Sequence, residues 1–411
     1  MLLQALKALS ESEERLPSFY SLQRVGYRID LDRSGRVVSF VEIGRDTAPL
    51  AIPYRTRTSK PLALPVDRGD YVLGVSVAGK APKEAAKRHE LWTSLIGELL
   101  EITSLKQLKV VHRFALGVDP AKLGVPEGFD PSRFVAIYVD GSFFADDERV
   151  QQWWAQRQMA ELGTGQAPTQ CSVCGEHVPV VENVTTQVRG LSAVGGKATM
   201  ALISGNMDVF ERHGLSRASG ASICTSCGEA THQALNKLLG DPARSKTLGT
   251  SKFLWWTSVP VADFIGALIS GDTDESVAQI FEAVLTGKVL PSLSADRFYA
   301  VILSANVNRV VVRSWLDISL PEALANARSW LDRISVVDHA GDLVRHPGVW
   351  SLVASLAAPG QGSPLSRVSP SLIDDVLRSA LTGARLPYRV LAQCVQRIRA
   401  EQGSVTTPRA N

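Results

Sequence analysis

Apolar and polar positions alternate on both sides of a short polar turn near the beginning of the chain. The alternation runs from Arg24 to Glu42 and is interrupted by Asp32-Arg33-Ser34-Gly35, in which Asp, Ser and Gly suit a tight turn. This pattern predicts a β-hairpin. Farther along, apolar residues recur at near-helical spacing from Pro82 to Leu100 and predict a helix, with the proline suited to its first turn. The apolar run Phe134 to Val139 predicts a buried strand.

The second half of the chain mixes strand-like and helix-like patterns. Strands are predicted over residues 199–204, 253–258, 298–303 and 307–315, the last two as a pair. Helices are predicted at the N-terminus, where residues 1–9 are amphipathic, and over residues 229–239, 321–334, 347–357, 370–381 and 388–400. Together these elements predict an α+β fold.

We expect more than one packed region, because 411 residues exceed the size at which a single hydrophobic core keeps growing. A break rich in linker residues lies at 163–168, directly before the first cysteine pair. The predicted division is an N-terminal α/β domain with a basic loop (1–165), an inserted subdomain with a four-cysteine zinc site (166–245), a mixed α/β region (246–345) and a helical C-terminal region (346–411).

The composition is that of a globular protein. Hydrophobic residues make up 45% of the chain and charged residues 21%, which argues against disorder and against a membrane protein. No apolar run approaches the ~18 residues that span a bilayer. The first residues have neither the basic leader nor the small-residue cleavage site of a signal peptide, so the cytoplasm is the expected location.

Basic residues form two local clusters, although the formal net charge of +3 is too small to indicate a polyanionic partner by itself. The first cluster is the predicted basic loop, with the candidate nucleic-acid-binding residues Arg55, Arg57, Thr58, Ser59 and Lys60. The second lies around the start of the predicted helix at 82–100, with the candidates Lys83, Lys87 and Arg88. The alternative interpretation of both clusters is a solvated basic face.

Four of the five cysteines form two Cys-x-x-Cys-Gly units, with the pairs Cys171 and Cys174, and Cys224 and Cys227. Such a knuckle places two thiolates on one metal, and the glycine relieves the tight turn. The spacing therefore predicts a zinc site that closes a long loop. Because four thiolates leave no open position for water, this zinc is expected to be structural. Redox or disulfide cysteines are the alternatives, and Cys394 is expected in a core.

Known catalytic patterns are missing from the sequence. His89-Glu90 begins like a metalloprotease helix, but Thr93 stands where the second histidine is required. The sequence contains no Gly-x-x-x-x-Gly-Lys-Ser/Thr phosphate loop and no Gly-x-Gly-x-x-Gly. Adjacent carboxylates such as Asp146-Asp147 and Asp374-Asp375 suit helix capping and surface roles. The chain is therefore predicted not to be an enzyme.

Motifs along nearly the whole chain, in conserved order, resemble one known family: the large subunit of type I-C CRISPR Cascade, the Csd-one or Cas-eight-c family. The opening residues 1–6, the hairpin at 27–35 and the run from Arg57-Thr58-Ser59-Lys60-Pro61 to 70–74 carry the resemblance in the first part. Later segments that carry it are 209–214, the strand before Trp255-Trp256, 298–306 with Arg309, Arg313 and Trp315, and 381–387 leading to 397–399.

The resemblance implies a non-catalytic subunit of an RNA-guided complex. It would recognise the short motif flanking the target (the PAM) in double-stranded DNA and assist duplex opening. The implied partners are guide RNA, target DNA, the Cascade backbone and guide-end-capping subunits, and a recruited helicase-nuclease that cuts the DNA. The protein would read the flanking duplex while base pairing with the guide supplies sequence specificity.

The sequence departs from the family in two places. The family more often has a single cysteine followed by Thr-Gly where this chain has a full knuckle, so the zinc prediction rests on the cysteine spacing alone. Family members usually continue beyond the last predicted helix into a small-subunit-like helical region, which implies a separately encoded small subunit or loss of that function. A stand-alone zinc-containing nucleic-acid-processing enzyme and a purely structural scaffold of the complex remain as alternatives.

Overall fold

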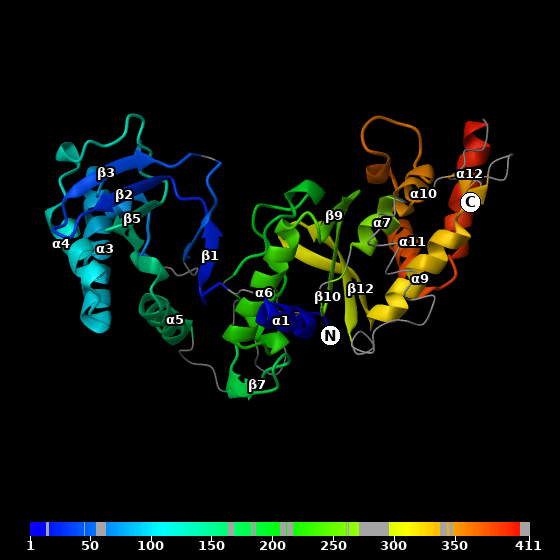
Figure 1. Ribbon diagram of the computed structural model, residues 1–411, viewed down its shortest axis with the longest axis horizontal. Coiled ribbons are helices and arrows are strands. Elements are labelled where there is room, and N and C mark those ends of the chain that lie inside the picture. The colour runs from blue at the N-terminus through cyan, green and yellow to red at the C-terminus, as the bar shows by residue number, and fades with distance from the viewer. Residues whose placement is uncertain are drawn as a thin grey trace. The chain divides into compact units, whose positions relative to one another are not determined.

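The computed structural model divides the chain into two compact units (Figure 1). It describes residues 1–13, 16–44, 46–54, 63–162, 168–181, 184, 186–205, 211, 217–259, 261, 263–270, 296–337, 343–344 and 348–402. Unit 1 comprises Met1–Ser12, Gln187–Ser204 and Ala230–Asn411, and unit 2 comprises Glu13–Thr186 and Gly205–Glu229. The predicted region 166–245 thus contributes to both units, and the division into four regions stays a prediction.

Unit 2 contains a four-stranded mixed sheet in the order β3-β2-β5-β6. Its strands are β2 (Tyr27–Leu31), β3 (Val37–Glu42), β5 (Val135–Val139) and β6 (Ser142–Phe143). The pair β2–β5 is parallel, and the other two pairs are antiparallel. The predicted hairpin is confirmed, and its turn is held by Asp32, whose Oδ1 accepts hydrogen bonds from the backbone N–H groups of Ser34 (2.8 Å) and Arg36 (2.9 Å).

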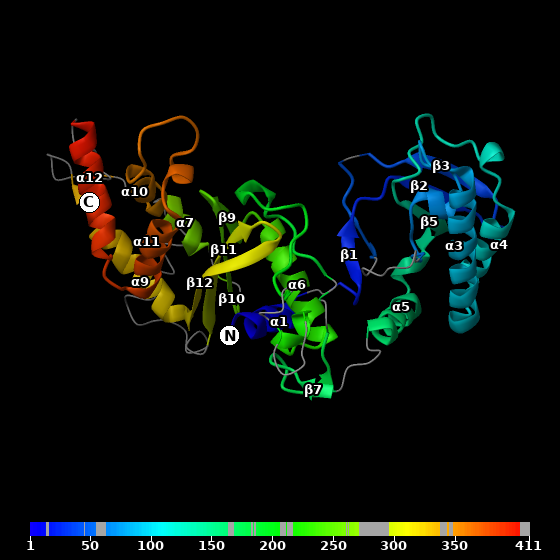
Figure 2. The same cartoon turned by 180° about the vertical axis from the view of Figure 1, so that it is seen from behind.

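Helices connect the strands of this sheet and cover it. The helices of unit 2 are α2 (Gly69–Val72), α3 (Pro82–Thr103), α4 (Lys106–Gly117) and α5 (Glu148–Leu162), with short 3-10 turns at Pro120–Lys122, Phe144–Asp146 and Arg217–Ala221. Figure 2 shows α3 and α4 side by side; Ser104 and Leu105 join them, and Ser104 has the left-handed conformation (φ 53°). The core between helices and sheet includes the fully buried Trp92 and Trp154.

Unit 2 also has two small two-stranded sheets. Strand β1 (Tyr20–Gln23) pairs with β4 (Leu50–Pro53), and β7 (Pro168–Gln170) pairs with β8 (His177–Pro179), both antiparallel. The β7–β8 pair is a hairpin whose turn carries the first two cysteines, and β4 of the other pair ends directly before the segment that leads to the predicted basic loop.

Unit 1 is built on an antiparallel sheet in the order β12-β11-β10-β9. Its strands are β9 (Ser245–Leu248), β10 (Ser251–Thr257), β11 (Arg297–Asn306) and β12 (Arg309–Ser319). Along β10, Phe253 and Trp255 enter one hydrophobic core, whereas Leu254 and Trp256 enter another on the opposite face. Because both faces are buried, this strand is an uninterrupted apolar run rather than an alternating one.

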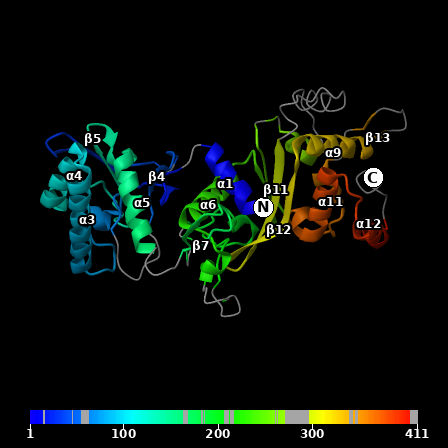
Figure 3. The same cartoon turned by 90° about the horizontal axis from the view of Figure 1, so that it is seen from below.

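Helices cover both faces of the sheet, as Figure 3 shows with α1 and α6 on one side and α9 and α11 on the other. The first layer consists of α1 (Leu2–Ser12) and α6 (Thr225–Gly240), with a 3-10 turn at Ser192–Val194. The second contains α7 (Phe264–Ser270), α9 (Leu320–Arg333), α10 (Val349–Ser355), α11 (Pro370–Thr382) and α12 (Tyr388–Glu401), with a 3-10 turn at Pro364–Arg367. The short strands β13 (Val336–Val337) and β14 (Leu343–Val344) contain two residues each.

The α+β fold is confirmed, and so are the predicted strands at 253–258, 298–303 and 307–315 and the predicted helices, within a few residues at their ends. The predicted strand at 199–204 is wrong: Met200 and Ala201 form only isolated bridges, to Val188 and Arg309.

Among the described residues, no helix combines the length and the apolar character needed to cross a membrane.

The two-faced sheet gives the first testable prediction. Phe298 on β11 is fully buried against α7, so Phe298→Ala leaves a cavity and should lower the free energy of unfolding by about 3–5 kcal/mol. The control is Val312→Ala on the neighbouring strand, which is 40% exposed and should cost about 0.5 kcal/mol or less. Denaturant unfolding followed by circular dichroism would measure both, and equal losses would contradict the assignment of this core.

Candidate metal centre

The first cysteine pair lies in the turn between β7 and β8. The backbone N–H of Cys171 donates to the carbonyl of Glu176 (2.8 Å), and that of Gly175 donates to the carbonyl of Cys171 (2.9 Å). Gly175 has a φ of +78°, a conformation that residues with a side chain rarely adopt. The glycine of the motif therefore permits the tight turn that points Cys171 and Cys174 to the same side.

The second pair lies at the beginning of α6. Cys224 directly precedes the helix and Cys227 lies in its first turn, where the N–H of Gly228 donates to the carbonyl of Cys224 (2.9 Å). A backbone hydrogen bond from Ser172 to Ser222 (2.7 Å) joins the two knuckles directly.

The two knuckles are also joined beyond the turn. The N–H of Val181, just after β8, donates to the carbonyl of Ile223 (3.0 Å), and Val180 forms an isolated bridge with Cys224. These contacts and the Ser172–Ser222 bond flank the cysteines, so we call them the knuckle clamp. The clamp aligns two segments that are distant in sequence.

The four sulfur atoms converge. All lie within 4.8 Å of one another, and the Sγ atoms of Cys174 and Cys224 are 4.0 Å apart. Three of the thiols are buried, and that of Cys174 is half-buried. A tetrahedral zinc ion with Zn–S bonds of about 2.3 Å places its sulfur ligands roughly 3.8 Å apart. The donor set, burial and spacing therefore fit a metal ion held by four thiolates.

Burial and backbone donors act in opposite directions on these thiols. Burial raises the pKa of Cys224 and of Cys227 above the ordinary value of a thiol. Burial has the same tendency at Cys171, but backbone N–H groups of Cys174, Cys224 and Val173 point at its sulfur and lower its pKa to about 6. The thiolate of Cys171 is thus favoured by the fold itself, whereas the raised pKa values of Cys224 and Cys227 mean that these two thiols need a nearby cation to ionise at neutral pH.

A buried carboxylate lies two residues beyond the last cysteine. Glu229 is 1% exposed, and the hydroxyl of Tyr54 lies 2.7 Å from both of its carboxylate oxygens. The N–H groups of Phe19 and Thr186 also donate to it, each at 3.3 Å. Because the phenol hydrogen goes to the carboxylate, the hydroxyl of Thr186, 2.8 Å from the Tyr54 oxygen, acts as donor to that oxygen.

This hydrogen-bond network connects the helix of the metal centre to β1 and β4. Phe19 directly precedes β1, and Tyr54 directly follows β4. Tyr54 is also the last described residue before the predicted basic loop. No sequence pattern predicts this network, because Tyr54, Thr186 and Glu229 are far apart along the chain and belong to no motif.

The predicted nucleic-acid-binding residues fall into two groups. Arg55, Arg57, Thr58, Ser59 and Lys60 lie outside the described residues. On α3, Lys83 and Lys87 are exposed, whereas Arg88 forms ion pairs with Asp70 and Glu84. Asp70 belongs to α2 and is fully buried, so Arg88 joins the two helices. A role for these residues in binding nucleic acid stays a prediction.

His89 takes part in packing. Its two ring nitrogens lie 3.0 Å from the backbone carbonyl oxygens of Tyr71 and Ala115, so both are engaged within the fold. This agrees with the conclusion that the His89-Glu90 pair does not begin a metalloprotease site.

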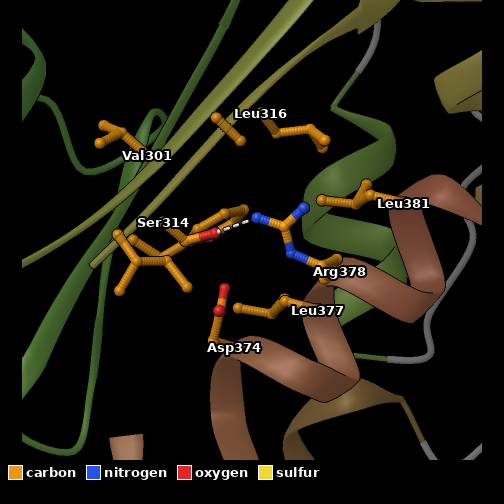
Figure 4. Close-up of a pocket in the computed structure, with 10 residues that line it drawn as sticks. Val301, Ser314, Leu316, Asp374, Leu377, Arg378 and Leu381 are labelled. Atoms are coloured by element: carbon orange, nitrogen blue, oxygen red, sulfur yellow. Dashed lines mark hydrogen bonds between the residues drawn. The ribbon is translucent and has the colours of Figure 1, made fainter. Parts of the chain in front are cut away.

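A small pocket lies between α11 and the sheet of unit 1 (Figure 4). Its lining is mostly apolar, with one hydrogen bond from Arg378 to the hydroxyl of Ser314 (2.9 Å) and with Asp374 nearby. Its volume of about 20 Å³ suits a single water molecule rather than a substrate.

A protein-family model described as CRISPR-associated protein (Cas_Csd1) matches residues 2–411, nearly the whole chain. The chain belongs to this family. The resemblance found in the sequence is therefore confirmed, and the chain is a CRISPR-associated protein of the Cas_Csd1 family. No curated protein matches the chain. In this Cas_Csd1 protein the four cysteines are positioned to hold a metal ion, as the sequence predicted.

The Glu229 network gives the second prediction. Glu229→Ala leaves the buried Tyr54 hydroxyl and two backbone N–H groups without their acceptor, and should lower the free energy of unfolding by about 2–4 kcal/mol. Tyr54→Phe removes one donor and should cost about 1–2 kcal/mol. Denaturant unfolding measures both.

The control for these variants is Glu176→Ala, an exposed carboxylate beside the first knuckle, which should change the stability by less than about 0.5 kcal/mol. A Glu229→Ala protein as stable as the Glu176→Ala protein would show that the network contributes nothing.

Proposed function

We propose that this Cas_Csd1 protein is the non-catalytic large subunit of an RNA-guided CRISPR interference complex (Cascade). It recognises the target-flanking motif, the PAM, in double-stranded DNA and assists opening of the duplex. The observation that carries the proposal is the family match over residues 2–411.

The physical requirements of this function agree with the chain. Base pairing with the guide supplies sequence specificity, so the protein needs cationic side chains that grip phosphates and read a short stretch of duplex. The basic loop at 55–60 supplies such side chains directly after Tyr54, which the Glu229 network holds in place. The exposed Lys83 and Lys87 add positive charge on α3.

The proposed partners are guide RNA, target double-stranded DNA, the Cascade backbone subunits, the guide-end-capping subunit and a separately encoded small subunit. DNA cleavage belongs to a recruited helicase-nuclease. The proposed setting is the cytoplasm, where guide and invading DNA meet.

We also propose that the metal of the four-cysteine site is structural zinc. Four thiolates complete the tetrahedral coordination of zinc, so no position remains for a reacting water. The ion would supply the positive charge that stabilises ionised thiols at this spacing, and Cys171, Cys174, Cys224 and Cys227 would hold the two knuckles together with the knuckle clamp.

Zinc content tests this assignment. Elemental analysis should find about one zinc per chain, and Cys224→Ser should remove it and destabilise unit 2, since structural zinc in small fingers contributes ~10 kcal/mol of apparent binding energy. Cys394→Ser is the matched control, because Cys394 lies on α12 and should leave zinc content and melting unchanged. A metal-free wild-type protein with the same melting temperature as a zinc-supplemented sample would refute the assignment.

Binding by the assembled complex tests the proposed function. The double variant Arg55→Ala and Arg57→Ala should weaken binding to duplex carrying the flanking motif, by about 1–3 kcal/mol if an arginine reads a guanine edge. An arginine that contacts only phosphate should instead lower the affinity for every sequence and reduce the salt slope by about one.

The charge-matched control for the loop is Lys106→Ala with Lys109→Ala, two exposed lysines of α4. Unaltered affinity and motif preference in the loop variant would reassign the loop as a solvated surface.

The absence of catalysis is tested separately. The complex should leave DNA intact in Mg²⁺ until helicase-nuclease and ATP are added. Cleavage that is abolished by a carboxylate substitution in this chain would establish an enzyme.

A further inference from the structure

Unit 2 contains a cavity of about 190 Å³ at the open end of the β2–β3 hairpin. Three arginines line it, Arg24, Arg28 and Arg133, together with Tyr138 of β5 and the apolar or small residues Val25, Ile43, Gly44, Thr47, Ala48 and Leu50. None of the lining residues is acidic. Arginines that converge on a cavity without a carboxylate in its wall create a site suited to an anion.

Arg28 is fixed in position before any ligand arrives. Its Nε and Nη2 atoms donate to Oδ1 of Asp30 at 2.9 Å and 2.6 Å, and its guanidinium carbon lies 3.9 Å from the centre of the Tyr138 ring. The hydrogen bond from Arg28 lowers the pKa of the Asp30 carboxyl below its ordinary value, so the pair is ionised. A guanidinium that is already oriented loses less entropy on binding an anion.

Arg133 is oriented in a similar way. It forms an ion pair with Glu42, and its guanidinium carbon lies 4.9 Å from the centre of the Tyr27 ring. Gly26 provides the space for its side chain, because a Cβ atom at position 26 would lie 2.6 Å from Nε of Arg133. The glycine is therefore required for the arginine to lie along this wall.

Arg24 differs from the other two arginines. It is exposed, and within the described part of the chain no carboxylate pairs with it. Asp30 and Glu42 balance Arg28 and Arg133, so Arg24 contributes a positive charge that no carboxylate of the described residues pairs with. An unneutralised cation beside two oriented guanidinium groups attracts a monoanionic group.

The size of the cavity restricts the ligand. The cavity of about 190 Å³ exceeds the roughly 10–15 Å³ that a single water needs and is smaller than the roughly 300 Å³ at which pockets for drug-sized ligands begin, so it has room for a small polar group such as a phosphate. Arginine forms bidentate hydrogen bonds with phosphate oxygens, which makes phosphate the matching anion.

We propose that this cavity binds a phosphodiester group of a nucleic-acid strand through Arg24, Arg28 and Arg133. The proposal rests on the proposed function to the extent that a nucleic acid is the partner, and it does not require recognition of the flanking motif. The strand is either guide RNA or target DNA, and both present the same group to the cavity.

Fluorescence anisotropy with the purified full-length chain tests the cavity. Labelled single-stranded RNA, single-stranded DNA and duplex DNA are titrated at several salt concentrations. Arg24→Ala should weaken binding of the relevant strand roughly three- to tenfold and reduce the slope of log affinity against log salt by about one. Arg24→Lys should retain most of the salt slope, because it keeps the charge.

The control is Arg36→Ala, which removes the same charge from the turn at the opposite end of the hairpin and should leave binding unchanged. A loss confined to RNA identifies the guide as the source of the phosphate, and a loss confined to DNA identifies the target. Equal binding by Arg24→Ala and wild type would overturn the inference, as would a wild-type chain that binds none of the three. Neither result decides the proposed function, which is tested on the assembled complex.

Discussion

The metal centre depends on the knuckle clamp, the backbone hydrogen bonds that align the turn after β7 with the segment before α6. Closing the long loop between the two knuckles costs conformational entropy, and a few backbone hydrogen bonds alone offset little of that cost. A metal shared by the four thiols would add a cross-link at the same place. The clamp aligns the two knuckles, and a bound metal would add stability to β7, β8 and the first turn of α6.

Local patterns in the sequence predicted the elements but not their assembly. The hairpin at 24–42 follows from alternation and a turn, and the β10 strand from a short apolar run, because each is encoded by neighbouring residues. The cysteine site was predictable for the same reason. The packing of residues 187–204 and α1 into unit 1 depends on contacts between distant segments, which no local period encodes. The Glu229 network and the arginine cavity are equally non-local.

Positive charge in unit 2 is of two kinds. Arg88 forms ion pairs with Asp70 and Glu84 and joins two helices, so its charge is neutralised within the fold. Arg28 and Arg133 are also paired, but both line a cavity, so pairing orients them without covering them. A count of basic residues does not distinguish these cases, which is why the sequence singled out Arg88 and passed over Arg24, Arg28 and Arg133.

Gly26 has an evolutionary consequence. Its φ is not among the positive values, so the glycine is needed for space and not for backbone conformation. Substitution at position 26 is therefore coupled to the residue at position 133. A homologue with a larger residue in place of the glycine needs a shorter or differently oriented side chain in place of the arginine, and a homologue without the arginine no longer needs the glycine. Among homologues the two positions should change together, which would mark the cavity as a selected feature.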